Sequence, residues 1–383
     1  MLFRLWAKLS FIITVALVLI FPVQAEQTPE VCTALQMVKK GADRSGRIDQ
    51  CISALRKIYD GKQEDWPAPD LAETVTYEPL APLPAALYTP DNPHSELKEK
   101  LGKQLFSDPR LSKSGQIACA HCLHKELGFT DRLRNSFGHD RQKGNRNAIS
   151  IVNTGFYREH FWDGRAGTLE DQALAAMTNP IEMAADPNET VDRVKADKAY
   201  TELFADVYGD DEISLERLLK SLVVYVRSEN RRSRFDLFME GRRTALKDQQ
   251  LWGLHLFRTK ARCMNCHNGS FMTDQKYHNL GLHFYGRKNE DLGRYNVTEK
   301  DEDVGAFRTA SLRNISKTGP WMHMGTFSQL KFIINVYNAG GYHPKPKEGR
   351  EYDPPFPQTS KLLQKLNLTN EEKAALNSFL EAL

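Results

Sequence analysis

The chain has 383 residues, with 52 basic and 49 acidic side chains and a formal net charge of +3. Because the two signs are interspersed and the net charge is small, nothing in the composition indicates nucleic-acid binding. A chain of this length is long enough for two domains of ordinary size, each with its own core.

Residues 1–25 have the pattern of a cleaved secretory signal. Two basic residues precede an apolar run from Leu9 to Val23, and small Ala25 ends the segment. The run is shorter than the roughly 20 apolar residues that a membrane span requires, so a permanent anchor is the less favoured alternative. We therefore expect a periplasmic protein that starts near Glu26 and has no membrane span after cleavage.

Residues 26–90 form a predicted N-terminal extension. Cys32 and Cys51 lie outside the two C-x-x-C pairs of the chain. In an oxidising compartment they are expected to form one disulfide, with two free thiols as the alternative. The run "EPLAPLPAALYTPDNP" at 78–93 is rich in proline and predicts an extended connector.

The rest of the chain favours helices. Apolar periodicity and N-terminal capping signals mark segments at 95–106, 168–177, 214–230, 245–257, 326–341 and 368–383. Thr326 with Gln329, and Thr369 with Glu372, have the spacing of a capping box. Convincing alternating strands are few, so the predicted fold class is mainly α.

The sequence "RCMNCHNG" contains a complete C-x-x-C-H motif, made of Cys263, Cys266 and His267. Two thiols at this spacing can bind the vinyl groups of haem, and the histidine that follows can bind the iron. The alternatives are a zinc site, which needs further Cys or His ligands, and a redox dithiol, which needs a βαβ context. The motif favours covalently bound haem c.

The sequence "CAHCLH" departs from that motif by one residue. Cys119 and Cys122 keep the spacing, but Leu123 follows them and the histidine comes one step later, at His124. On a helical turn this moves the imidazole by about 100° around the axis. Three interpretations stay open: a rearranged turn in which His124 binds the iron, a haem that His139 binds from the other side, and a disabled site.

The sequence from Pro90 to Gly341 resembles the bacterial di-haem cytochrome c peroxidase family, including its methylamine-utilisation (MauG) branch. Nine segments in the order of the family carry the resemblance: "GKQLFSDPRLSKSGQIACAHC", "FTD", "GNRNAISIVN", "FWDGRAGTLEDQAL", "NPIEM", "SRFDLFMEGRRTAL", "CMNCHNG", "FRTASLRNISKTGPWMHMGTF" and "VYNAGG".

The resemblance implies two cytochrome c-like haem domains with a calcium site between them. The N-terminal, peroxide-reacting domain is expected at 91–235 and the C-terminal, electron-transfer domain at 236–383. Asn147, Thr318 and Pro320 match the calcium positions of the family. An amide oxygen and two backbone carbonyls suit calcium, which prefers oxygen ligands.

The resemblance also implies catalytic roles for three residues. Trp162 matches the aromatic residue that lies between the haems. Glu182 matches the carboxyl that moves a proton while the O–O bond of peroxide breaks, and Gln172 is expected in the same pocket. His139 matches the histidine that binds the peroxide-reacting haem in the resting state of peroxidase members and leaves it on reduction.

The sixth ligand of the second haem separates the branches of the family. Peroxidase members have Met at the position of Tyr337, whereas the MauG branch has Tyr. A phenolate ligand would favour ferric and more oxidised iron. Met322 and Met324 are the rival ligands, because "WMHMGTF" departs from the usual family sequence.

These features leave three functions open. The first is a peroxidase that reduces hydrogen peroxide with electrons from a small cytochrome c or copper protein, which His139 favours. The second is a MauG-like oxidase that modifies Trp residues of a partner protein, which Tyr337 favours. The third is an electron-transfer cytochrome, which the defect at Leu123 favours. The family also suggests a homodimer.

Overall fold

The structure, a computed structural model, describes Cys32 and residues 42–383. The predicted signal segment lies outside these residues. Helices, turns and loops form nearly all of the described chain, which contains a single pair of two-residue strands, β1 (Tyr277–His278) and β2 (Phe307–Arg308), paired antiparallel. The prediction of a mainly α fold is therefore confirmed.

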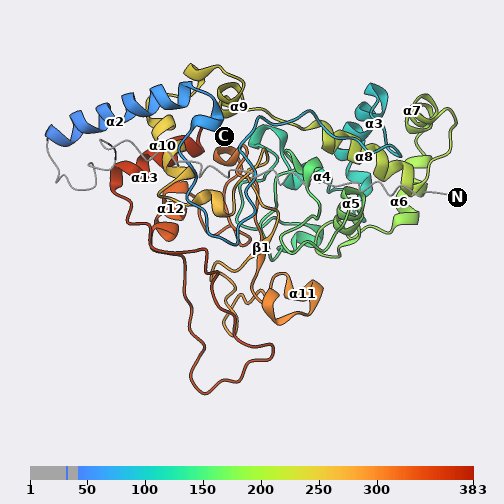
Figure 1. The fold of residues 1–383 in the computed structure, drawn as a ribbon. Helices are drawn as coiled ribbons and strands as arrows, with labels where there is room; N and C mark the ends of the chain where they lie inside the picture. Colours follow the sequence, from blue (N-terminus) through green and yellow to red (C-terminus); the bar gives the residue numbers. More distant parts are fainter. Residues whose placement is uncertain (1–31, 33–41) are drawn as a thin grey trace, which may run out of the picture.

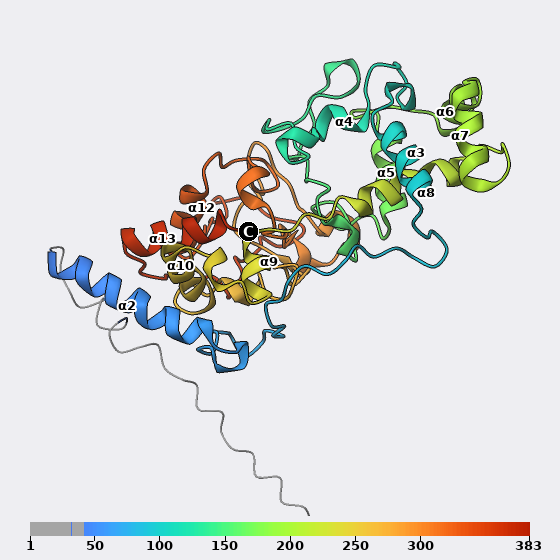
Figure 2. The same ribbon diagram turned by 90° about the horizontal axis from the view of Figure 1, so that it is seen from above.

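The helices gather in two groups (Figure 1 and Figure 2). The first lobe, residues 95–228, contains α3 (Glu96–Phe106), α4 (Cys119–Cys122), α5 (Leu169–Thr178), α6 (Pro187–Lys195), α7 (Lys198–Tyr208) and α8 (Leu215–Ser228). The second lobe, residues 42–80 and 234–383, contains α2 (Ala42–Asp60), α9 (Arg234–Met239), α10 (Asp248–Arg258), α11 (Tyr295–Thr298), α12 (Leu330–Asn338) and α13 (Asn370–Leu380).

Each lobe has a hydrophobic cluster of its own. The division into two domains stays a prediction. Its boundary after residue 235 falls within α9, whose Phe235 packs in the cluster of the second lobe.

The core of the first lobe depends on the contact between α3 and α8. Ser95 caps α3 by accepting a hydrogen bond from the backbone N–H of Lys98, as expected for a helix that begins here. Leu101 and Leu105 are fully buried against α8. Between them, Gly102 lets the helices approach so closely that an added Cβ would lie 2.0 Å from the Ser221 carbonyl oxygen.

The core of the second lobe depends on a similar contact between α10 and α13. A Cβ on Gly253 would lie 2.1 Å from the carbonyl oxygen of Ala375. At the start of α13, the predicted capping box is confirmed: Thr369 accepts a hydrogen bond from the N–H of Glu372, and Glu372 accepts one from the N–H of Thr369.

Helix α12 begins later than predicted. The capping box of Thr326 and Gln329 is wrong, because the helix starts at Leu330 and the Gln329 side chain makes no capping hydrogen bond. The residues that precede α12 form other contacts instead: Phe327 pairs with Trp321 in a short antiparallel bridge. The predicted glycine end is confirmed, since Gly340 and Gly341 have φ angles of 92° and 84°, which favour glycine.

The N-terminal extension packs on the second lobe. Helix α2 lies along α10, and Tyr59 at its end is fully buried, with its hydroxyl 3.1 Å from Nδ1 of His255. The predicted disulfide between Cys32 and Cys51 is confirmed. The Pro-rich connector at 78–93 contains no helix, as predicted. Among the described residues, no helix is both long and apolar enough to cross a bilayer.

The close approach at Gly253 predicts a large effect of one methyl group. Gly253→Ala should lower the free energy of unfolding by about 1–3 kcal/mol, because overpacking forces α10 and α13 apart. The matched control is Gly46→Ala in α2, where nothing lies within 4 Å of the added Cβ. The control should keep or slightly raise stability, since alanine favours helices. Equal stability of the two variants in urea unfolding would contradict this packing.

Candidate functional site

A large cavity lies in the second lobe where it meets the first. Eight of the predicted site residues line it: Asn147, Trp162, Cys263, Cys266, His267, Thr318, Pro320 and Tyr337. Most of the remaining wall is apolar, with side chains such as Leu282, Ile333 and Leu376. The structure thus brings together residues that the sequence separates by up to 190 positions.

The second cysteine turn presents an imidazole to this cavity in a defined tautomer. The turn follows α10, and the His267 N–H donates to the Cys263 carbonyl over 2.8 Å. Nδ1 of His267 lies 3.0 Å from the Met272 carbonyl oxygen, to which it can only donate. Burial lowers the pKa of His267. The neutral ring therefore keeps Nε2 free as an acceptor, the arrangement typical of a histidine that binds a metal.

Tyr337 projects from α12 into the same cavity. It shares the cavity wall with Cys263 and Cys266, and burial raises its pKa. Of the two rival ligands, Met322 also lines the cavity, whereas Met324 is buried outside its wall. The geometry leaves Tyr337 and Met322 as candidates for the sixth ligand.

The cavity wall also contains cationic groups. Arg308 is 3% exposed, and its Nη1 atom has no hydrogen-bond partner among the described residues. Burial alone would lower the pKa of His278. The hydrogen bond with the Asp274 carboxylate outweighs this effect and raises the pKa to about 10. A haem carries two propionate groups, so a guanidinium with a free Nη1 atom and an imidazolium suit it. The two free cysteines, the neutral imidazole and this charge pattern all fit haem c.

A zinc site fits less well. Cys266, Asp274 and His278 have ligand atoms within 4.8 Å of one another. Structural zinc sites usually contain two to four thiolates or a full set of Cys and His ligands.

The predicted calcium residues lie at the junction of the lobes. Trp162 donates from Nε1 to the Asn147 carbonyl over 2.9 Å, and Asn147 Nδ2 donates to the Leu133 carbonyl over 3.0 Å. Among the described residues, no hydrogen bond uses Asn147 Oδ1 or the carbonyl oxygens of Thr318 and Pro320. These three oxygens suit a hard cation.

A second group of predicted residues lies in the first lobe around α4. Burial raises the pKa of Cys119 to about 12 and that of Cys122 to about 11, and the Glu182 carboxyl is close enough to contribute to both shifts. Burial also raises the pKa of Glu182 itself. Its Oε1 atom accepts a hydrogen bond from Asn179 Nδ2 over 2.9 Å.

His139 lies on the loop that packs against Glu182. Its N–H donates to the Glu182 carbonyl over 2.8 Å, and its Nδ1 atom is buried without a partner among the described residues. A Cβ on the neighbouring Gly138 would lie 2.1 Å from the Ile181 carbonyl oxygen, so this contact requires glycine. Gln172 is half-buried on α5, and no hydrogen bond of the described chain joins it to Glu182.

The structure does not bring His124 to this group. His124 is exposed, whereas Leu123 packs against the apolar cluster of the first lobe.

Sequence reasoning missed the residues that hold the second cysteine turn in place. Asn265, between the two cysteines, donates from Nδ2 to the Asp70 carbonyl over 2.8 Å and accepts at Oδ1 from the Ala72 N–H over 2.7 Å. Asp70 also donates its N–H to the Arg258 carbonyl. The extension therefore forms a strap across the turn. No sequence pattern reveals this contact, because it joins a single Asn of the motif to an extension outside the family resemblance.

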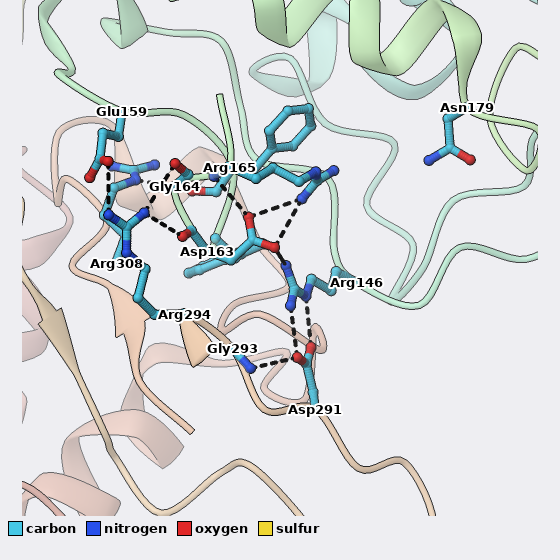
Figure 3. Close-up of polar contacts among 12 residues, drawn as sticks. Arg146, Glu159, Asp163, Gly164, Arg165, Asn179, Asp291, Gly293, Arg294 and Arg308 are labelled. Atoms are coloured by element: carbon cyan, nitrogen blue, oxygen red, sulfur yellow. Dashed lines mark hydrogen bonds and ion pairs between the residues drawn. The ribbon is translucent and has the colours of Figure 1, made fainter. Parts of the chain in front are cut away.

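Sequence reasoning also missed an ion-pair network between the lobes (Figure 3). Arg146 binds both carboxylate oxygens of Asp291 over 2.7 Å and one oxygen of Asp163 over 2.6 Å. Nearby, Arg294 pairs with Glu159 and donates to the Asp163 carbonyl. The network connects the segment that carries Asn147 and Trp162 with the loop before α11.

Comparisons with known proteins identify the family of the chain. A sequence model described as di-haem cytochrome c peroxidase matches residues 96–244. Cytochrome-c peroxidase IdrP1 of Pseudomonas sp. (strain SCT) is 34% identical over 337 residues, which cover 80% of this chain and 86% of that protein. The chain belongs to the di-haem cytochrome c peroxidase family. As a member of it, the protein is an oxidoreductase of the peroxidase type, and haem c is the cofactor that the family implies.

Members of this family with MauG names are also similar to the chain. Methylamine utilization protein MauG of Methylorubrum extorquens is 31% identical over 88% of this chain and 90% of that protein. A crystal structure of a MauG-like protein associated with microbial copper homeostasis has a TM-score of 0.69 at 32% identity, over 82% of this chain and 94% of that one. The mainly helical fold is shared with that structure.

The ion-pair network predicts a large loss of stability on removal of its arginine. Arg146→Ala leaves Asp291 without its guanidinium partner at 12% side-chain exposure. The free energy of unfolding should fall by about 3–5 kcal/mol. In the control Arg232→Ala, the lost partner Glu240 is 43% exposed, and the loss should be at most about 1 kcal/mol. Similar losses in urea unfolding would contradict the role of the network.

The ion pair of Arg146 and Asp291 also predicts that the free energy of unfolding depends on pH. Burial alone would raise the pKa of Asp291. The hydrogen bonds from Arg146 outweigh this effect and hold the pKa below its ordinary value. The pair therefore stabilises the fold above the unfolded pKa of about 3.9, and the stabilisation is lost as the pH falls through the folded value. The difference between wild type and Arg146→Ala should narrow from pH 7 to pH 3. A constant difference would contradict this linkage.

Proposed function

We propose that this protein reduces hydrogen peroxide at a haem attached to Cys119 and Cys122, with electrons that arrive through a haem attached to Cys263 and Cys266. A small cytochrome c or copper protein is the expected donor. One observation carries the proposal: Trp162 of the first lobe lies in the wall of the cavity that holds the second cysteine turn. An aromatic side chain at this junction is suited to electron passage between the lobes.

The haem supplies the redox chemistry, and the protein supplies proton transfer and positioning. Reduction of one peroxide molecule to two water molecules consumes two electrons and two protons. Glu182 is suited to move a proton between the peroxide oxygens, because burial raises its pKa and favours the protonated carboxyl. Asn179 orients this carboxyl through a hydrogen bond.

Calcium is the proposed ion at the lobe junction. Asn147 Oδ1 and the carbonyl oxygens of Thr318 and Pro320 would bind it, with water completing the shell. Asn147 also accepts the indole hydrogen bond of Trp162 at its backbone carbonyl. The ion would therefore stabilise the position of Trp162.

Export to the periplasm is part of the proposal. The apolar segment at 9–23 has the pattern of a signal peptide. The disulfide of the extension supports an oxidising compartment, because disulfides rarely persist in a reducing cytosol.

A MauG-like oxidase is the second candidate, and Tyr337 favours it. A phenolate on the second haem iron would stabilise its oxidised states and suit it to storing oxidising equivalents rather than accepting electrons from a donor. The substrate would then be Trp residues of a partner protein. Relatives with MauG names support the same candidate.

The proton-transfer role predicts a selective loss of activity. Glu182→Gln should lower kcat/KM for peroxide about 10²- to 10⁴-fold, because the amide cannot transfer the proton. Haem content should stay unchanged. The control Glu202→Gln changes an exposed glutamate on α7 and should leave the rate unchanged. Steady-state assays with a reduced carrier protein measure kcat/KM of both variants. Equal rates for the two variants would exclude Glu182 from the reaction.

The two candidate functions differ in their dependence on Tyr337. Tyr337→Phe removes only the phenol oxygen. If this oxygen binds the second iron, the ferric absorption and electron paramagnetic resonance spectra should shift, and the near-infrared signal expected of a MauG-like oxidase on adding peroxide should disappear. Tyr342→Phe, at a tyrosine that is 42% exposed, is the control and should leave the spectra unchanged. Unshifted spectra of the Tyr337 variant would point to Met322.

A further inference from the structure

The two cysteine turns of the chain share the backbone hydrogen bond from the residue after the second cysteine to the first cysteine. In the second turn, the N–H of His267 donates to the Cys263 carbonyl over 2.8 Å. In the first turn, the N–H of Leu123 donates to the Cys119 carbonyl over 3.1 Å. Both donors stand four residues after the first cysteine, so Leu123 occupies the backbone position of His267.

The residues that follow are also equivalent. The carbonyl of Asn268 accepts a hydrogen bond from the Thr273 N–H over 3.0 Å, and the carbonyl of His124 accepts one from the Phe129 N–H over 2.8 Å. The separation is five residues in both turns. His124 therefore occupies the backbone position of Asn268, not that of the iron-binding histidine.

The carbonyl that orients His267 has an equivalent in the first turn, and that equivalent carbonyl has a different partner. Met272 and Gly128 stand five residues after His267 and Leu123, and both have positive φ angles, of 51° and 76°. The Met272 carbonyl faces Nδ1 of His267, whereas the Gly128 carbonyl accepts a hydrogen bond from Ser150 Oγ over 2.7 Å. In the first turn the Gly128 carbonyl thus has a hydrogen-bond donor that is not an imidazole.

The side chains agree with the backbone. Leu123 packs against the apolar cluster of the first lobe, and His124 is exposed. Two hydrogen bonds to the His124 carbonyl, from the N–H groups of Leu127 and Phe129, fix the turn in this orientation. Bringing His124 inward would break these bonds and expose Leu123 to water. The residues of this turn fit covalent attachment of haem, but they do not fit the usual axial ligation of its iron.

We infer that the first cysteine turn gives the haem iron no axial ligand, and that His139 is the protein ligand of this haem. This inference rests on the proposed attachment of haem to Cys119 and Cys122. His139 is 14% exposed at its side chain, its Nδ1 atom has no partner in the described chain, and its loop is fixed against Glu182.

Three variants of the full exported protein test the inference: His124→Ala, His139→Ala and Leu123→His. The measurements are bound haem per chain, the mass of the peptide that carries Cys119 and Cys122, and the ferric spin states by electron paramagnetic resonance. His124→Ala should change none of them. His139→Ala should shift the signal of the first haem to a different spin state, and Leu123→His should shift it by adding a second imidazole at the position equivalent to His267.

The outcomes separate this inference from the proposed function. A shift of the first-haem signal in His124→Ala, or none in His139→Ala, overturns the inference while the two-haem proposal stands. A wild-type peptide without haem on Cys119 and Cys122 overturns the two-haem proposal. In that case Leu123→His decides the inference: a gain of haem on this peptide supports a missing ligand as the cause, and no gain overturns it.

Discussion

Arg146 joins two lobes that have separate hydrophobic cores. Its guanidinium binds Asp291 of the second lobe and Asp163 of the first, and all three side chains are largely buried. In such a setting each charge needs its partner, because an unpaired ion would have to give up its hydration without compensation. The next residue in the chain is Asn147, which accepts the Trp162 hydrogen bond. The position of the indole at the lobe junction therefore depends on this ion pair.

Local signals in the sequence predicted much of the fold. Ser95, Thr168 and Thr369 cap helices in segments that the sequence marks as helical, and each cap involves residues only three apart in the chain. Tyr337 lies at helical spacing from Leu330, Ile333 and Ile334 on α12, and all four residues line the cavity. The disulfide followed from the compartment and from the two cysteines left over by the haem motifs.

Contacts that lie beyond helical capping and periodicity escaped prediction. The pairing of Phe327 with Trp321 delays the start of α12, although Thr326 and Gln329 have capping-box spacing. Arg146 and Asp291 are 145 residues apart, and no periodicity marks either of them. The same holds for Asn265, whose partners lie in an extension outside the resemblance. For Leu123, the sequence revealed the anomaly, but only the hydrogen bonds of the turn identify it as the equivalent of His267.

The cavity has walls from both lobes: the first contributes Trp162 and Asn147, and the second contributes the second cysteine turn. Whatever fills it touches both lobes at once and acts as a third component of their interface. Contacts that such a group makes with both lobes stabilise their docked arrangement, and by reciprocity docking stabilises the position of the group in the cavity. A change that loosens the docking of the lobes therefore also loosens the surroundings of a covalently attached cofactor.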